Sequence, residues 1–292
     1  MSQANEAISP LRQRMIEDMN VRNFTPKTQV THIRAVKKLA SYLGHSPAKA
    51  TAEDLRQFFV HLSNEGASPF VINATIYGLR FFFRYIVDKP EVIRRLKAVS
   101  VPSKVPVILT LDEVSRLLLA AKTAKFRAAF GLGYGAGLRI QEICHLKVKD
   151  IDSQRMAIRV EQGKGKKDRF AMLSNNLLLL LRAWWREGHA RGRLYDSGWL
   201  FPGQNPVNPM TARHLSRVCL MAAKEAGITK HVTMHALRHS FATHLLEQKV
   251  DIRVIQVLLG HSKIQTTTRY TQVASSLLKE AQSPLDKLTL PE

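Results

Sequence analysis

The segment 98–108 divides this chain into two parts that we expect to fold separately. It runs Ala-Val-Ser-Val-Pro-Ser-Lys-Val-Pro-Val-Ile, and its two prolines and two serines interrupt the helical periodicity on either side. A chain of 292 residues usually forms two domains of ordinary size. We therefore expect an N-terminal domain over residues 1–100, a linker over 101–108 and a second domain over 109–292.

The first hundred residues have the pattern of helices. Thr25-Pro26 supplies a hydroxyl cap and a proline at the first helical position, and the helix that it starts extends to Gly44. A second helix is expected from Ala52 to Leu62, and Ser68-Pro69 opens a third. Basic residues lie off the apolar stripes of these helices: Lys27, Arg34, Lys37, Lys38, Arg80 and Arg84. Such residues either face solvent or grip phosphates.

The second domain is expected to be rich in helices with one small sheet. Thr110 and Glu113 have the spacing of a capping box. Apolar residues alternate with polar ones from Met156 to Val160, and residues 170–173 can form the return strand. The turn between them, 163–169, is rich in glycine and lysine. The expected fold class is mainly α with a small β-sheet (α+β).

The charge of the chain indicates a polyanionic partner. The formal net charge is +21, divided as +7 over residues 1–100 (15 basic against 8 acidic) and +14 over 101–292 (29 against 15). A basic excess in both halves suggests DNA or RNA. The alternative is a generally basic soluble protein.

Cysteine usage and the lack of long apolar runs indicate the cytoplasm. Cys144 and Cys219 have no paired spacing, so neither a disulfide framework nor a zinc finger is expected. The N-terminus lacks the basic and apolar regions of a signal peptide. The longest aliphatic run, Leu177 to Leu181, is too short to span a bilayer. We therefore expect a cytoplasmic protein without a membrane partner.

The sequence His235-Ala-Leu-Arg238 can present an imidazole and a guanidinium on neighbouring parts of one helix face. His235 and His239 also have the spacing of zincin ligands, but no glutamate stands beside His235, and the arginine would repel a dication. The pair therefore suits an anion. Its ordinary alternative is a structural helix face.

Arg139 stands at an expected helix start, in Gly137-Leu-Arg-Ile-Gln-Glu142. Its ordinary alternative is an exposed ion pair with Glu142, of little energetic value. Glycines at 133, 135 and 137 suggest close packing or a sharp turn. The Gly/Lys turn lacks the Walker A pattern, and a solvated hairpin tip is its ordinary interpretation.

A last helix is expected between Asp251, as its cap, and Gly260, as its C-terminal stop. Its expected apolar face consists of Val254, Ile255, Leu258 and Leu259. His261 is the first side chain past this helix, and Tyr270 follows nine residues later. A lone tyrosine after a threonine run is usually a packed surface aromatic.

These segments together resemble the tyrosine recombinases, the phage-integrase family, in both order and spacing. The family has an arginine in a G-L-R-x-x-E segment, a hairpin lysine, H-x-x-R, G-H, and then a tyrosine. The matching positions here are Arg139, Lys164, His235, Arg238, His261 and Tyr270. Lys166 and Lys167 neighbour the hairpin lysine, and Lys164, between two glycines, matches best.

The resemblance implies site-specific recombination of double-stranded DNA without a cofactor or metal. Tyr270 would attack the scissile phosphate to give a 3′-phosphotyrosyl link, with Arg139 and Arg238 clamping the phosphate. Lys164 would protonate the leaving oxygen, His235 would accept the phenol proton, and His261 would hydrogen-bond the phosphate. The N-terminal helices would form a core-binding domain, and with the catalytic domain they would clamp the duplex.

The family also implies a homotetrameric synaptic complex and no small-molecule substrate. Leucines recur in the segment 275–292, which either folds back on its own domain or docks on a neighbouring subunit. The reaction can serve integration, excision, transposition or dimer resolution. The competing functions are a DNA-binding protein that does not cut, a relaxing topoisomerase and, more distantly, an RNA-binding protein.

Overall fold

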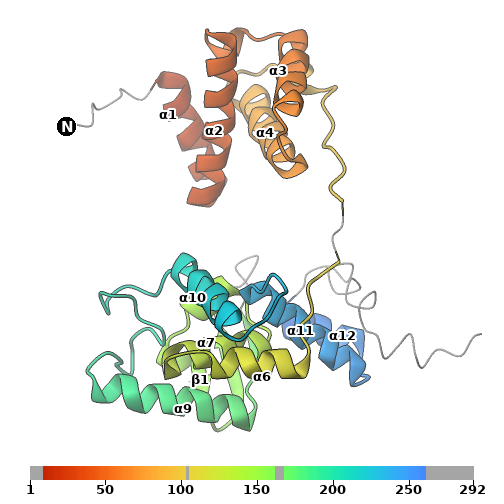
Figure 1. Cartoon of the computed structure of the whole chain (residues 1–292). Helices are drawn as coiled ribbons and strands as arrows, with labels where there is room; N and C mark the ends of the chain where they lie inside the picture. The colour runs from red at the N-terminus through yellow and green to blue at the C-terminus, as the bar shows by residue number, and fades with distance from the viewer. Residues whose placement is uncertain (1–8, 103–104, 162–167, 261–292) are drawn as a thin grey trace, which may run out of the picture. The chain divides into compact units, whose positions relative to one another are not determined.

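The computed structural model describes residues 9–102, 105–161 and 168–260. It divides the chain into two compact units, Met1–Ser103 and Lys104–Glu292 (Figure 1). The division lies inside the segment that the sequence predicts as a linker, 101–108.

The first unit consists of helices in its described residues. Thr25 caps α2, whose last residue precedes Gly44, and Gly44 has a φ of 71°. The predicted second and third helices are α3 and α4, capped by Thr51 and Ser68. The elements are α1 (Pro10–Val21), α2 (Pro26–Leu43), η1 (Pro47–Lys49), α3 (Ala52–Asn64), α4 (Pro69–Phe81), the π-helical turn η2 (Phe82–Ile86) and α5 (Pro90–Ile93).

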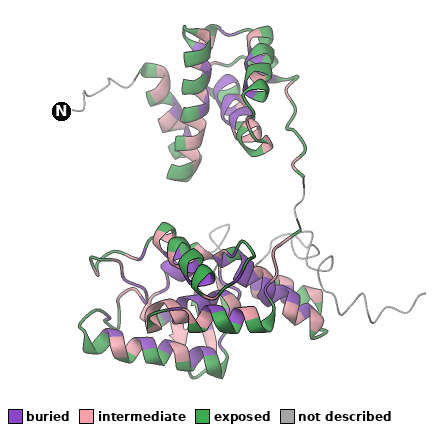
Figure 2. Cartoon of the chain, viewed as in Figure 1, coloured by how far each residue is buried: buried purple, intermediate pink, exposed green. Residues whose placement is uncertain are grey.

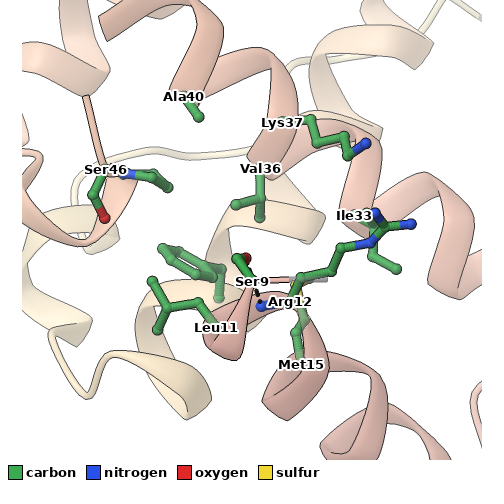
Figure 3. Close-up of a pocket in the computed structure, with 11 residues that line it drawn as sticks. Ser9, Leu11, Arg12, Met15, Ile33, Val36, Lys37, Ala40 and Ser46 are labelled. Carbon is green, nitrogen blue, oxygen red and sulfur yellow. Dashed lines mark hydrogen bonds between the residues drawn. The ribbon is translucent and has the colours of Figure 1, made fainter. Parts of the chain in front are cut away.

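The core of the first unit lies where α2 packs against α4 and η2 against α1. Its fully buried side chains include Met19, Leu39 and Phe83. A pocket of about 300 Å³ lies beside this core, between α1 and α2 (Figure 3). Its lining is mostly apolar, with Arg12 and Lys37 among the lining residues. The candidate catalytic residues all belong to the other unit.

The second unit is built around the buried helix α7. Its described elements are α6 (Leu111–Leu119), α7 (Ala124–Gly135), α8 (Ile140–Cys144), η3 (Val148–Asp150), β1 (Ile151–Asp152), β2 (Ala157–Val160), β3 (Arg169–Met172), α9 (Asn175–Ala190), α10 (Ala212–Glu225), α11 (Met234–Glu247) and α12 (Ile252–Leu259). Helix α7 packs against α6, α8, α9, α10 and α11. Ala128, Phe130 and Leu132 of α7 are fully buried, whereas α9 and α10 carry exposed outer faces (Figure 2).

Hydroxyl side chains fix where these helices begin. Thr110, Thr123, Ser174, Thr211 and Thr233 each accept a hydrogen bond from a backbone N–H in the first turn of the helix that follows. Such caps satisfy donors that a helix leaves unpaired. The capping box predicted for Thr110 and Glu113 is present in both directions.

The sheet has three antiparallel strands in the order β1-β2-β3. Strands β2 and β3 form the predicted hairpin, with Ile158 opposite Ala171, while β1 was not predicted. Successive side chains of β3 point to opposite faces, so Phe170 is 63% exposed while Arg169 and Ala171 turn towards the protein. The predicted fold class, mainly α with a small β-sheet, is confirmed.

Both cysteines are buried free thiols. Burial raises the pKa of Cys144 to about 11 and that of Cys219 to about 12.

Within the described ranges, we find no helix whose length and apolar character would let it cross a membrane.

Candidate active site

Three of the six predicted catalytic residues, Arg139, His235 and Arg238, lie in the described part of the second unit. Lys164, His261 and Tyr270 lie outside the described residues, as do Lys166 and Lys167. The described site is formed by α8, α11, the end of α12 and the start of β3.

A glycine turn brings Arg139 to the start of α8. Gly137 has a φ of 61°, and a Cβ built on it would lie 2.5 Å from a ring carbon of Phe241. Only glycine allows both this left-handed conformation and this close approach to α11 without strain. The predicted sharp turn therefore places Arg139, the N-cap residue of α8, beside the helix that carries His235 and Arg238.

Glu142 holds Arg139 by both its backbone and its side chain. Glu142 Oε2 accepts from the backbone N–H of Arg139 at 2.8 Å, and Oε1 accepts from Nη1 of the guanidinium at 2.7 Å. The Arg139 side chain is 21% exposed and that of Glu142 only 7%. The alternative of an exposed surface ion pair is therefore wrong: the pair is largely withdrawn from water.

Arg238 is more deeply buried than Arg139, at 3% exposure. Its Nη1 donates to the carbonyl oxygen of Gly137, and its Nη2 donates to that of Leu259 at 2.7 Å. Nη1 also lies 3.9 Å from Glu142 Oε2. Two carbonyls on different segments therefore fix the plane of this guanidinium.

A third arginine, Arg169, belongs to the cluster and was not predicted as a site residue. Its Nη2 donates to Glu142 Oε2 at 2.8 Å, and its Nη1 donates to the carbonyl oxygen of Leu258 at 3.0 Å. Burial is the main cause that lowers the pKa of Arg169, opposed by the nearby charge of Glu142. The strand alternation that puts Arg169 on the same face as Ala171 was the signal for it in the sequence.

The three guanidiniums converge on the C-terminal end of α12. Arg169 donates to the carbonyl of Leu258, Arg238 to that of Leu259, and Arg139 Nη2 to that of Gly260 at 3.3 Å. Cations are favourable there because the last carbonyls of a helix lack helical partners and carry the negative end of its dipole. The carboxylate of Glu142 lies within ion-pair distance of the same three guanidiniums, at 2.7 Å from Arg139, 2.8 Å from Arg169 and 3.9 Å from Arg238.

The predicted ends of α12 are correct, but its predicted apolar face is partly wrong. Asp251 caps the helix, and Gly260 follows it with a φ of 61°. Ile255 and Leu259 are buried, as predicted. Val254 is 49% exposed, because a residue one position before Ile255 is turned about 100° away from it.

His235 is exposed at the surface beside the arginines. Partial desolvation lowers the pKa of His235, and the charges of Arg238 and Arg139 lower it further, while Glu142 opposes them. His235 is thus neutral near pH 7 and able to accept a proton. Its ring centroid lies 6.3 Å from that of His239.

A buried contact of Ser240 and a partly buried contact of His244 fix the helix that carries His235 and Arg238. Ser240 Oγ accepts from the backbone N–H of Leu109 at 2.8 Å and donates to the carbonyl of Ala236. The Tyr134 hydroxyl lies 2.8 Å from His244 Nδ1. Helix α11 is thereby tied to the chain that enters the unit and to α7.

The arrangement can bind an anion and exchange a proton with it. Two oriented guanidiniums, that of Arg238 buried and that of Arg139 partly buried, suit the oxygens of a phosphate, and the neutral imidazole can act as a base. Among the described residues, we find no group of three or more His, Cys, Asp or Glu side chains that could hold a metal ion.

Comparison with known proteins agrees with this chemistry. Residues 108–276 match the phage integrase family, and residues 11–91 match the N-terminal SAM-like domain of phage integrases. A putative integrase/recombinase, y4qK of Sinorhizobium fredii, is 42% identical over 97% of this chain and 91% of its own length. Tyrosine recombinase XerA of Pyrococcus horikoshii is 36% identical over 82% of this chain and 80% of its own length.

Solved structures agree as well. The crystal structure of XerA recombinase, 28% identical, covers 93% of this chain and 97% of its own, with a TM-score of 0.55. XerH bound to a palindromic difH substrate, 24% identical over 97% of this chain and 86% of its own, has the same fold with a TM-score of 0.72. The chain therefore belongs to the phage integrase family and is a tyrosine recombinase, an enzyme of site-specific DNA recombination that cleaves and rejoins strands.

Proposed function

We propose that Arg139, Lys164, His235, Arg238, His261 and Tyr270 carry out strand cleavage and rejoining. The observation that carries the proposal is the convergence of Arg139, Arg238 and Glu142 beside a neutral His235, in the unit that holds the family's sequence pattern.

The Tyr270 hydroxyl would attack the phosphorus of the scissile phosphate. A bond forms between the phenolic oxygen and phosphorus, and the bond to the 5′-oxygen breaks, which leaves a 3′-phosphotyrosyl link. His235 takes the phenol proton, and Lys164 gives a proton to the leaving 5′-oxygen. Attack by the freed 5′-hydroxyl of another strand reverses these steps. The covalent link conserves the phosphodiester bond, so rejoining needs no ATP.

Arg139 and Arg238 would stabilise the charge that develops on the non-bridging oxygens. Oriented donors in a site withdrawn from water are effective because they need no reorganisation as charge develops. His261 adds a hydrogen bond to the phosphate. Glu142 orients Arg139 and transfers no proton.

Double-stranded DNA is the proposed partner, and a homotetramer the proposed synaptic assembly. The net charge of +21 supports a polyanionic partner. Structures of XerH and of lambda integrase are described as bound to DNA sites, which supports the same partner here. The proposal extends to two domains that clamp the duplex. It includes a cytoplasmic location, which cell fractionation tests.

The test is a covalent adduct on a nicked suicide duplex. Such a duplex loses a short fragment after cleavage, so rejoining is prevented and the adduct accumulates. Fragments that the purified protein binds supply the site. The wild-type protein should give a slowly migrating protein–DNA band on a denaturing gel. Tyr270→Phe should bind the same duplex and give no band. A band that persists with Tyr270→Phe would overturn the assignment of the nucleophile.

The same assay separates the competing functions. A DNA-binding protein that does not cut gives no adduct with any duplex. A relaxing topoisomerase gives an adduct and removes supercoils, but it does not exchange strands between two marked sites. Recombination between such sites is the result expected here.

A further inference from the structure

We propose that Arg169 is a positioning residue for strand cleavage. It holds Glu142 and the end of α12 in fixed positions relative to Arg139. The inference rests on the proposed function, because Arg139 and Tyr270 supply the chemistry that Arg169 would position. Arg169 lies at the first position of β3, five residues after Lys164 in the sequence.

The two ends of the Arg169 guanidinium bind different segments of the chain. Nη2 donates to Glu142 Oε2 at 2.8 Å, and Nη1 donates to the carbonyl oxygen of Leu258 at 3.0 Å. The planar fork of a guanidinium can make both bonds at once, whereas the ammonium of a lysine is a single point donor on a flexible stem. Arg169 therefore connects β3 to α8 and to α12.

The end of α12 also packs directly on Arg169. A Cβ built on Gly260 would lie 2.5 Å from Nε of Arg169 and 2.6 Å from its Cδ. The glycine thus leaves the space that the guanidinium occupies. Gly260 is the last described residue before His261 in the sequence, and the contact fixes its position against β3.

Charge explains why the contact should affect Arg139. Glu142 is 7% exposed and Arg169 is 13% exposed, so water screens their interaction little. Glu142 Oε2 accepts from both Arg169 and the backbone of Arg139, while Oε1 accepts from the Arg139 guanidinium. Without Arg169, Glu142 Oε2 loses a charge-assisted hydrogen bond. The carboxylate can then turn towards Arg238 Nη1, which lies 3.9 Å from Oε2 in the wild-type structure. The Arg139 guanidinium would then lose its orientation.

The test compares Arg169→Gln and Arg169→Lys with the wild-type protein in single-turnover adduct formation on the suicide duplex. We expect Arg169→Gln to slow the reaction by about 10–100-fold, the scale of a small displacement of a reacting group. Arg169→Lys should recover part of that loss. Binding to the uncleaved duplex should change by less than about threefold, since Arg169 is not proposed to touch DNA.

Arg159→Gln is the matched control. Arg159 lies on the adjacent strand β2 and also pairs with carboxylates, Asp168 at 3.1 Å and Glu161 at 3.5 Å, but its side chain is 49% exposed. Its loss should leave the adduct rate within about threefold of wild type, as expected for a surface pair.

A double-mutant cycle with Glu142→Gln separates positioning from a merely structural role. If Arg169 acts through Glu142, the double variant should be no slower than the slower single variant.

Added guanidinium should also accelerate adduct formation by Arg169→Ala. Full-rate cleavage by Arg169→Gln would overturn the inference. The inference would also be overturned if the rate reductions of the two single variants multiply in the double variant, or if all three Arg169 variants fail to fold.

The proposed function has a separate outcome. An adduct that persists with Tyr270→Phe overturns the function itself, whatever Arg169 does. A Tyr270-dependent adduct that forms at the wild-type rate in Arg169→Gln overturns only this inference.

Discussion

Arg238 Nη2 donates to the carbonyl oxygen of Leu259 at 2.7 Å, which ties a guanidinium on α11 to the last residue of α12. The side chain is 4% exposed and also donates to Gly137. Its orientation is therefore set by the protein before any phosphate binds, and such preorganisation is what stabilises a developing charge.

Arg238→Lys should reduce cleavage strongly. A lysine at this position cannot keep both carbonyl contacts and offer a planar fork to the phosphate. We expect adduct formation to slow by about 10²–10³-fold, or about 3–4 kcal/mol of barrier. Arg116→Lys is the control, because Arg116 also donates to a backbone carbonyl, that of Ala226, but is 42% exposed. Equal losses in the two variants, at equal thermal stability, would contradict the prediction.

Gly137→Ala should destabilise the second unit by about 2–5 kcal/mol. The left-handed conformation costs a non-glycine residue about 1–2 kcal/mol, and crowding against Phe241 adds about 1–3 kcal/mol. Gly192→Ala separates the two causes, because Gly192 has nearly the same φ, 62°, with no atom within 4 Å of its Cβ position. Chemical denaturation measures both. Equal destabilisation in the two variants would mean that contact with α11 contributes nothing.

The sequence predicts what depends on neighbouring residues. The cap at Thr25, the stop at Gly44 and the capping box of Thr110 with Glu113 all involve residues a few positions apart, and all are present. The sharp turn at Gly137 and the ends of α12 follow from glycine and aspartate in the same way. The catalytic roles expected of Arg139, His235 and Arg238 are predicted from the resemblance of their sequence segments to a known family.

What the sequence does not predict depends on contacts between distant segments. Glu142 and Arg169 are 27 residues apart and meet only because β3 lies beside α8 and α12. The exposed-pair alternative for Arg139 and Glu142 failed for the same reason: tertiary packing, not spacing, buries the carboxylate. The exposure of Val254 is decided by which part of α12 faces α11. Hydrophobic periodicity limits which residues of α12 can face α11, but it does not determine which of them do.

Cleavage should survive a chelator. Arg139 and Arg238 supply positive charge at the position where a metal enzyme would place its cation. Adduct formation in excess EDTA should match the rate in Mg²⁺ within about twofold, apart from ionic-strength effects on DNA binding. Loss of the adduct in EDTA, restored by Mg²⁺ or Zn²⁺, would show that the proposed chemistry is wrong.

Deletion of residues 275–292 should separate DNA binding from synapsis. The segment lies outside the described residues, and its leucines are the reason to expect docking on a neighbouring subunit. The truncated protein should bind a single site nearly as well as wild type but should fail to form the synaptic complex and exchange strands. Recombination at full rate would contradict subunit docking. An insoluble product would favour a tail that folds back on its own domain.

The rate of cleavage should depend on pH through the protonation of His235. Desolvation and the charges of Arg238 and Arg139 lower the pKa of His235 below its usual 6.5. A general base acts only when deprotonated, so the rate should fall as pH drops through that lowered pKa and should reach a plateau above it, up to the pH at which the general acid Lys164 loses its proton. The acidic decline is therefore expected below pH 6.5, and His235→Gln should be slower throughout and lose this decline. His214→Gln is the matched control, because burial also lowers the pKa of His214, on α10, which is outside the proposed chemistry. A decline that remains in His235→Gln and disappears in His214→Gln would assign the base elsewhere.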